Sequence, residues 1–165
     1  NEEPDGSVDD ADAPRYAASK KGWEFGNQTW SDAIQIPDCN KSSFEDSFTD
    51  PQCRSYTNKG KTYYYYNWAY VQGYENLLCP GNWHVPSRSE LETAYDDLSE
   101  NPLSIAWGLP GYATSSSIYE VGSGGNVWTS TERDAAYAYY LTYNSDALAL
   151  YITATSFGYQ VRCVR

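Results

Sequence analysis

Residues 78–87 read Leu78-Cys79-Pro80-Gly81-Asn82-Trp83-His84-Val85-Pro86-Ser87, and a helix should begin where they end. Ser87 and Glu90 have the spacing of a capping box, in which each side chain accepts a hydrogen bond from the backbone amide of the other residue. Apolar residues then recur at helical spacing, at Leu91, Ala94, Tyr95 and Leu98. The pattern predicts a helix over Ser87–Leu98 with one apolar face.

Downstream of residue 100 the sequence becomes β-prone, with glycine and proline as turn signals. It predicts strands over Val127–Thr131, Tyr137–Tyr143 and Phe157–Val164. Side chains alternate between the two faces of a strand. In Tyr137–Tyr143 this alternation turns Tyr139, Leu141 and Tyr143 inward and leaves Tyr140 and Thr142 outward. In Phe157–Val164 the alternation places Tyr159, Val161 and Cys163 on one face and Gln160, Arg162 and Val164 on the other.

Upstream of residue 78 the signals are weaker. Thr62–Tyr66 is a β-prone aromatic run, and Asn67 is placed to cap a short helix through Trp68 and Val71. Residues 22–60 read as irregular, with Asn40–Asp50 as a polar loop. The single domain should therefore cover residues 21–165.

Residues 1–20 are predicted to form an acidic flexible tail. They hold six acidic residues before the first base and no Leu, Ile or Phe, so they cannot offset the entropy cost of ordering. The tail is interpreted either as a solvated linker or as an acidic tether after a lipidated cysteine that precedes this numbering. The second interpretation predicts an outer-membrane lipoprotein. Because the chain lacks a signal-peptide pattern and an initiator Met, we expect a mature or trimmed form.

Four cysteines, at 39, 53, 79 and 163, point to disulfides and an oxidising compartment. A zinc site is the alternative, but the chain has no CxxC spacing and only one His. Three pairings are open from the sequence. We favour Cys39–Cys53 as a local staple and Cys79–Cys163 as a long clasp.

The 165-residue chain carries a formal net charge of −11. This charge argues against a nucleic-acid partner, which requires clustered Lys and Arg. No run of 18 apolar residues is present, so the membrane should be reached only through a lipid anchor.

No arrangement of residues marks a catalytic centre or a metal or cofactor site. His84 is the only imidazole, and a single His in this setting is more often structural than catalytic. Thr129, Ser130 and Thr131 have no base marked for them, and the glycines at 122–125 lack the context of a nucleotide-binding loop. No EF-hand spacing indicates calcium. We therefore expect no catalytic residues, no metal and no cofactor.

Residues 134–155 have an unusual composition. They contain no Glu, Lys, Gln, Met or Trp, whereas the other 143 residues contain 26 of these types. These five types cannot be reached by changing only the first two bases of an Asn codon AAC or AAT. Adenine-directed diversification of an Asn-rich template would leave this signature, and so would a β-rich segment that disfavours charge. Both interpretations stay open.

Four motifs occur in order along the chain. They are Tyr65-Tyr66-Asn67-Trp68-Ala69, then residues 78–87, then Val127-Trp128-Thr129-Ser130-Thr131-Glu132, and finally residues 157–165 with Val161-Arg162-Cys163-Val164. This order resembles the Fibrobacter succinogenes major paralogous domain family and the variable proteins of diversity-generating retroelements. The resemblance covers about residues 60–165. It implies an α+β fold of the C-type-lectin-like class, related to the formylglycine-generating enzyme.

The resemblance also implies a variable region, about 134–155, displayed on a rigid scaffold. Trp128, Ser130, Thr131, Leu141, Gly158, Val161 and Cys163 would be scaffold residues. The ligand-binding positions would be Asp134, Ala135, Tyr137, Tyr140, Thr142, Asp146, Ala147, Ala149, Tyr151 and Thr153. Tyr137 shares the inward parity of Leu141, so it qualifies only if its strand starts later than Tyr137. Tyrosines at these positions would act as rigid anchors.

The expected function is that of a secreted or surface-displayed receptor or adhesin without enzymatic activity. Its ligand would be a protein or glycan on another cell or on a phage or host surface. One alternative is a formylglycine-generating type of enzyme, but that branch needs a reactive Cys pair near its C-terminus, and only Cys163 lies there. The triplets of calcium-dependent sugar-binding lectins are also missing. A structural pilus or envelope subunit is the other alternative.

Overall fold

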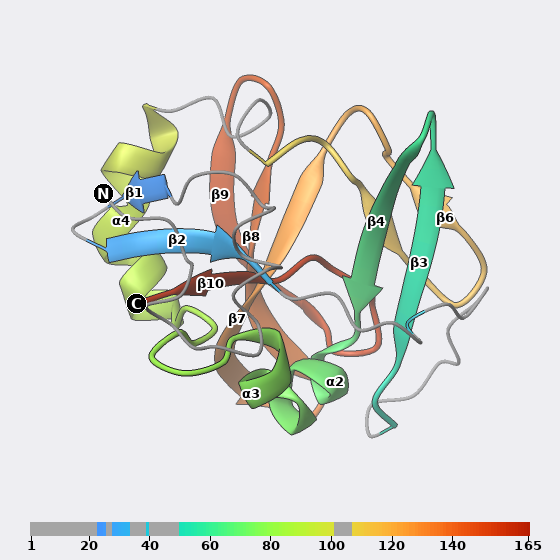
Figure 1. Cartoon of the computed structure of the whole chain (residues 1–165), viewed down its shortest axis with the longest axis horizontal. Helices are drawn as coiled ribbons and strands as arrows, with labels where there is room; N and C mark the ends of the chain where they lie inside the picture. Colours follow the sequence, from blue (N-terminus) through green and yellow to red (C-terminus); the bar gives the residue numbers. More distant parts are fainter. Residues whose placement is uncertain (1–22, 26–27, 34–38, 40–49, 101–106) are drawn as a thin grey trace.

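The computed structural model describes residues 23–25, 28–33, 39, 50–100 and 107–165. The predicted tail 1–20 and nearly all of the predicted loop Asn40–Asp50 lie outside the described residues. Within the described part, α-helices and mostly antiparallel strands are mixed (Figure 1). The helices are α2 (Trp68–Gly73), α3 (Glu75–Leu78) and α4 (Arg88–Ser99). The strands are β1 (Trp23–Phe25), β2 (Gln28–Asp32), β3 (Cys53–Asn58), β4 (Lys61–Tyr66), β5 (Tyr112–Ala113), β6 (Ile118–Tyr119), β7 (Gly125–Asp134), β8 (Tyr137–Tyr143), β9 (Leu148–Ala154) and β10 (Arg162–Val164).

The strands form several small sheets. A central sheet has the order β7-β8-β9, and a second sheet has the order β1-β2-β10, in which the last strand of the chain pairs with β2. The remaining pairs are β3-β4 and β5-β6. Every pair of named strands is antiparallel. The second sheet lies across the central one, because Trp30 of β2 and Val164 of β10 share a buried cluster with Val127 and Leu141 (Figure 1).

Helix α4 begins as predicted. Ser87 Oγ accepts a hydrogen bond from the Glu90 amide, and the Glu90 carboxylate accepts one from the Ser87 amide, so both arms of the capping box are formed. Leu91, Ala94 and Leu98 are buried in the cluster that contains Trp30 and Leu141. The apolar face of the helix therefore covers one side of the central sheet.

The short helix α2 also begins as predicted. Asn67 is fully buried, and its side-chain oxygen accepts hydrogen bonds from the amides of Tyr70 and Gln52. Two tryptophans tie this region to β7. The indole of Trp68 donates to the Thr129 carbonyl, and that of Trp128 donates to the Tyr66 carbonyl. These contacts fasten α2 and β4 to the central sheet.

Two disulfides cross-link the fold, and the favoured pairing is confirmed. The Cα atoms of Cys39 and Cys53 are 5.1 Å apart, and those of Cys79 and Cys163 are 5.6 Å apart. The second bridge joins the segment before α4 to β10, across 84 positions of sequence. None of the four cysteines is free. Among the described residues no helix is long and apolar enough to span a bilayer.

The prediction of one strand over Phe157–Val164 was wrong. Only Arg162–Val164 forms a strand, and residues 158–160 make single bridges to Ala113, Tyr66 and Val127 in turn. Because this segment passes between several elements, both of its faces are covered. Gln160, Arg162 and Val164 are therefore as buried as their neighbours, and the predicted alternation is absent. Strand β7 is also longer than the predicted Val127–Thr131.

Candidate functional site

The register of β8 and β9 places five of the predicted ligand-binding residues on one face of the central sheet. Directly opposite residues of an antiparallel pair point to the same face. Tyr140 pairs with Tyr151, Thr142 with Ala149, and Ala138 with Thr153. We call this set the outer face, and it consists of Tyr140, Thr142, Ala149, Tyr151 and Thr153.

The intervening residues point the other way and build the core. Leu141 pairs with Leu150, and Tyr143 with Leu148. Leu141 and Tyr143 are buried in the cluster under α4, and Leu148 and Leu150 pack against it. Leu141 and Tyr143 are therefore buried as their predicted inward turn requires, whereas Tyr139, also predicted inward, is only half-buried with the Arg88 guanidinium over its ring. On the opposite face Ala138 is fully buried, so the core covers that face at this end of β8. The predicted scaffold residues Trp128, Gly158, Val161 and Cys163 are buried as well, whereas Ser130 and Thr131 are half-buried.

An aromatic row runs across the outer face. Tyr140 lies between Tyr151 and the buried Tyr159, with ring centroids at 6.5 Å and 4.8 Å respectively. Tyr112 of β5 extends the row, 5.9 Å from Tyr159 and 5.5 Å from Tyr119. The two ends are open, since Tyr151 is 59% exposed and Tyr119 43%. The complete aromatic row is Tyr119, Tyr112, Phe157, Tyr159, Tyr140 and Tyr151.

Burial raises the pKa of three phenols of this row, those of Tyr112, Tyr140 and Tyr159. Desolvation raises the pKa of the Tyr140 and Tyr159 hydroxyls above the ordinary value. The nearby carboxylate of Glu120 adds to the rise in the pKa of Tyr140 and of Tyr112. These three rings therefore offer neutral aromatic faces and hydroxyl groups across the physiological pH range.

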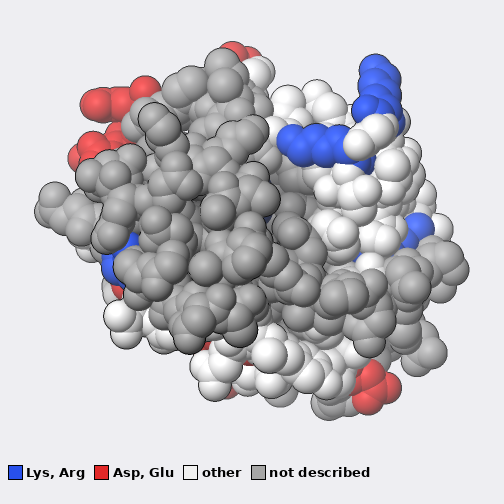
Figure 2. Space-filling model, in the orientation of Figure 1, with Lys and Arg blue, Asp and Glu red and all other residues white. Residues whose placement is uncertain are grey.

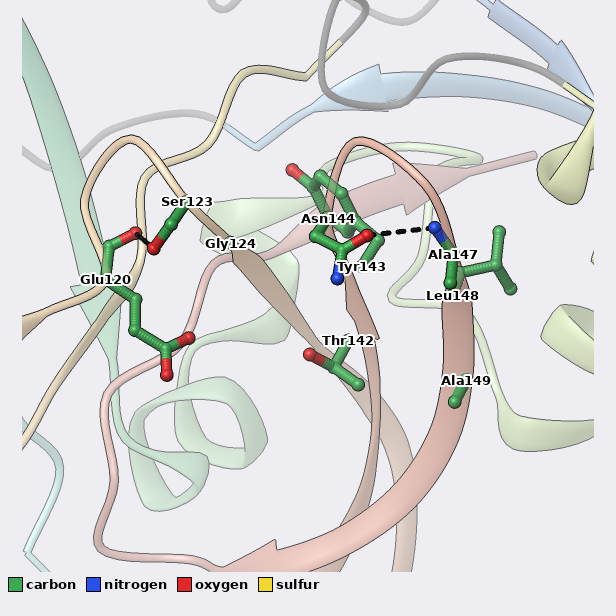
Figure 3. Close-up of a pocket in the computed structure, with 9 residues that line it drawn as sticks. All are labelled: Glu120, Ser123, Gly124, Thr142, Tyr143, Asn144, Ala147, Leu148 and Ala149. Carbon is green, nitrogen blue, oxygen red and sulfur yellow. Dashed lines mark hydrogen bonds between the residues drawn. The ribbon is translucent and has the colours of Figure 1, made fainter.

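A pocket of about 220 Å³ continues the outer face beyond the aromatic row (Figure 3). Thr142 and Ala149 form the next pair after Tyr140 and Tyr151 on the same face of the sheet, and both residues line the pocket. Ala147 lines it as well. The full lining is Glu120, Ser123, Gly124, Thr142, Tyr143, Asn144, Ala147, Leu148 and Ala149.

One wall of the pocket was not predicted. Glu120, Ser123 and Gly124 come from the turn between β6 and β7, and Figure 3 shows the Glu120 carboxylate directed toward Thr142. Glu120 has a φ of +64°, and its carbonyl accepts hydrogen bonds from the amides of Ser123 and Gly124. Nothing in the sequence near residue 120 signals its place beside β8.

The other wall is the turn between β8 and β9. The Asn144 side-chain oxygen accepts hydrogen bonds from the amides of Asp146 and Ala147, 2.8 and 2.9 Å away. This local turn is typical of Asn. It leaves Asp146 exposed at the tip of the turn and brings Ala147 to the pocket.

The remaining predicted residues lie at the far end of β8. Asp134 ends β7, and Ala135 follows it in the connection to β8. The exposed Asp134 carboxylate accepts hydrogen bonds from the amides of Ala136 and Tyr137. The Ala136 bond is the main cause that lowers the pKa of Asp134, and Arg133 contributes. Tyr137 starts β8, on the face of Leu141, and is 40% exposed with the Arg133 guanidinium over its ring. The structure thus does not bring these three residues to the pocket.

His84 has a structural environment. Its Nε2 lies 2.8 Å from Glu90 Oε2, and its backbone exchanges two hydrogen bonds with Val164. The Thr129 hydroxyl donates to the Tyr139 carbonyl. In the described ranges no group of three or more His, Cys, Asp or Glu side chains is placed to bind a metal ion.

Charge on the molecule is unevenly distributed. Figure 2 shows basic side chains gathered over the tip of the β3–β4 hairpin and acidic side chains over α4. In the part of the chain that the structure describes, the ion pairs are His84–Glu90, Arg88–Glu92 and Arg133–Asp134, so no cationic side chain neutralises Glu120.

Comparison of the chain with protein-family models, curated proteins and solved structures finds no match.

Proposed function

We propose that this chain is a ligand-binding protein, a receptor or adhesin, that binds through the outer face and the pocket next to it. The β8–β9 register carries this proposal, because it gathers Tyr140, Thr142, Ala149, Tyr151 and Thr153 on one face while their neighbours pack into the core. Of these five residues only Tyr140 packs against a buried cluster, so the other four can be exchanged at little cost to the core. Tyrosines among small residues are also typical of adaptable binding surfaces.

The scaffold suits this role. Two disulfides cross-link the chain, and the capped helix α4 and its buried cluster cover one face of the central sheet. The second buried cluster packs against the other face at Trp128, Ala138 and Tyr140. We propose that the fold is C-type-lectin-like and belongs with the variable proteins of diversity-generating retroelements, with residues 134–155 as the diversified region. A rigid platform lowers the entropy cost of binding, because the binding side chains are already in place.

The disulfides are typical of proteins that fold outside the cytoplasm. We therefore place the protein in the secreted or cell-surface class, with the acidic residues 1–20 as a tether to a lipid anchor. The ligand would be a surface protein or glycan of another cell, phage or host. Cys163 is bonded to Cys79, which favours a binding role over formylglycine-type chemistry, since that chemistry needs a reactive thiol.

A binding assay with matched variants tests the proposal. In one variant Thr142, Ala149, Tyr151 and Thr153 are replaced by polar residues, and Tyr140 is kept because it packs on Tyr159. In the control, the exposed Tyr56 and Tyr74 are replaced. Labelled chains are incubated with a panel of bacterial and host cells and scored by flow cytometry.

The outer-face variant should lose or change its cell preference, whereas the control should keep it. An outer-face variant that is folded and binds the same cells equally well contradicts the proposal. The diversification is tested separately in the neighbouring DNA, where a near-identical, Asn-rich template repeat should accompany a reverse-transcriptase gene.

A further inference from the structure

The pocket beside the outer face contains an ionised group that the protein leaves without an opposite charge. The Glu120 carboxylate points toward Thr142, and none of the ion pairs of the described residues includes it (Figure 3). Gly124 leaves room for it, because a Cβ on this residue would lie only 3.0 Å from Glu120 Oε1. The backbone of the turn therefore aims a carboxylate at the pocket rather than at a partner within the chain.

Aromatic rings lie next to this carboxylate. Glu120 directly follows Tyr119, one end of the aromatic row, and its charge adds to the rise in the pKa of the Tyr140 and Tyr112 phenols. Thr142 and Ala149 in the pocket form the next pair after Tyr140–Tyr151 on the same face of the sheet. A carboxylate in a pocket that borders an aromatic row is a favourable environment for an organic cation, which gains an ion pair in the pocket and can make cation–π contacts at its edge.

The size of the pocket limits what can enter. At about 220 Å³ it is smaller than the roughly 300 to 1,000 Å³ of pockets that enclose a drug-sized ligand. It suits one side chain of a larger partner, which would then cover the aromatic row. The net charge of −11 also attracts a basic partner over longer range.

From these observations we infer that the pocket receives a basic side chain, lysine or arginine, from the surface of a protein ligand. The inference rests on the proposed function and names the chemistry of its ligand. The ammonium or guanidinium group forms an ion pair with the Glu120 carboxylate, and no proton is transferred between them. Its aliphatic stem lies along Thr142 and Ala149, which line the pocket, and the surrounding surface of the ligand packs on Tyr151.

A glycan is the competing ligand, because sugars also stack on tyrosines and donate to carboxylates. The charge favours the protein ligand. The hydroxyl groups of a neutral sugar would donate hydrogen bonds to the Glu120 carboxylate but would form no ion pair with it. The net charge of −11 would not attract such a sugar. The two ligands are separated in the test below.

The test uses the full chain, labelled with ¹⁵N, and follows backbone amides by NMR during titration. The probes are the Nα-acetyl amides of lysine and arginine, with the Nα-acetyl amide of norleucine as the neutral control of similar shape. Methyl α-mannoside and methyl β-galactoside represent glycans. The variant is Glu120→Gln, and its matched control is Glu132→Gln, which removes the same charge from an exposed position on β7.

The basic probes should produce saturable shifts of the Thr142 and Ala149 amides with dissociation constants on the order of millimolar. Glu120→Gln should weaken this binding roughly three- to fivefold, as expected for a partly exposed ion pair, and Glu132→Gln should not. Added salt should weaken it as well.

The inference is overturned if norleucine amide shifts the same residues equally, if Glu120→Gln has no effect, if a sugar binds more tightly than the basic probes, or if no probe saturates. These failures differ from failure of the proposed function. If cell binding depends on the four residues replaced in the outer-face variant but not on Glu120, the outer face is still the binding site, and only the assignment of a basic ligand is wrong.

Discussion

Tyr140 of β8 lies directly opposite Tyr151 of β9, with 6.5 Å between their ring centroids, yet the two rings have different environments. Tyr140 is half-buried and packs on Tyr159, with the centroids 4.8 Å apart. Tyr151 is 59% exposed. One member of the pair therefore joins the outer face to the core, and the other is available to a ligand.

This difference predicts unequal stability effects. Tyr140→Ala should lower the free energy of unfolding by about 2 kcal/mol, because it removes a half-buried ring and its packing on Tyr159. Tyr151→Ala should change the free energy of unfolding by no more than about 0.5 kcal/mol, as is usual for exposed positions. Urea unfolding with unchanged m-values measures both. Equal losses for the two variants would show that Tyr151 is also a structural residue.

Asn67 should contribute more to stability than an ordinary helix cap. It is fully buried, accepts from the amides of Gln52 and Tyr70, and donates to the Asp50 carbonyl. Asn67→Ala leaves buried partners without a hydrogen bond and should cost about 3 kcal/mol. Asn67→Ser keeps a capping oxygen but is too short to make all three hydrogen bonds. Its free energy of unfolding should therefore lie between those of the wild type and Asn67→Ala.

Thermal and urea unfolding of the Asn67 variants can be compared with that of Ser99→Ala. Ser99 makes one exposed hydrogen bond, to the Asp96 carbonyl near the end of α4, and its loss should cost less than about 0.5 kcal/mol. If Asn67→Ala were no more destabilising than Ser99→Ala, the capping role assigned to Asn67 would be wrong.

The two disulfides should differ in their contribution to stability. The Cys79–Cys163 bridge spans 84 positions and the Cys39–Cys53 bridge spans 14. In the chain-entropy model the first stabilises by about 4–5 kcal/mol and the second by about 3 kcal/mol, because a longer loop loses more freedom when it is closed. Paired Cys→Ala variants, measured by guanidinium unfolding, check the order. A larger loss on removal of the short bridge would contradict the model.

Acid should weaken the turn at Asp134. The pKa of this carboxyl is lowered from 3.8, chiefly by the Ala136 amide and further by Arg133. Because the folded pKa lies below the unfolded pKa, the stabilisation is complete well above 3.8 and is lost as the pH falls through the lowered value. Carboxyl ¹³C titration by NMR measures the shift.

Arg133→Gln should reverse only part of the Asp134 shift, since the hydrogen bond from the Ala136 amide remains. A full return to the ordinary pKa in this variant would assign the shift to the arginine instead. The opposite control is Asp134→Asn. It should leave the turn independent of pH in the acidic range.

Several features of the fold could be predicted because their causes lie close together in the sequence. Ser87 and Glu90 are three residues apart, so the capping box of α4 is visible in the sequence and is present in the structure. The cap at Asn67 and the inward turn of Leu141 are equally local. The strand predicted over Phe157–Val164 failed for the converse reason, since its burial depends on partners far away in the sequence.

Tyr137 shows a limit of parity as a guide to exposure. It shares the face of Leu141 and would be buried if the core extended that far, yet it is 40% exposed at the end of the sheet. Alternation assigns a side chain to a face, but the neighbouring elements set how much of that face is covered. The ten predicted binding residues accordingly divide into the outer face, the β8–β9 turn and a separate group at Asp134, Ala135 and Tyr137.

Read alone, the 165 residues were enough to predict helix α4, its cap and the strand β8 with its two faces, because each depends on short-range spacing. The four cysteines allowed three pairings, and the tertiary structure decided among them. Folding was needed to bring Glu120 opposite Thr142 and to align Tyr112 and Tyr119 with Tyr140. Those contacts join a turn and a short hairpin to strands 20 or more positions away. Helix and strand propensities of neighbouring residues do not specify such long-range contacts, because packing of the whole chain determines them.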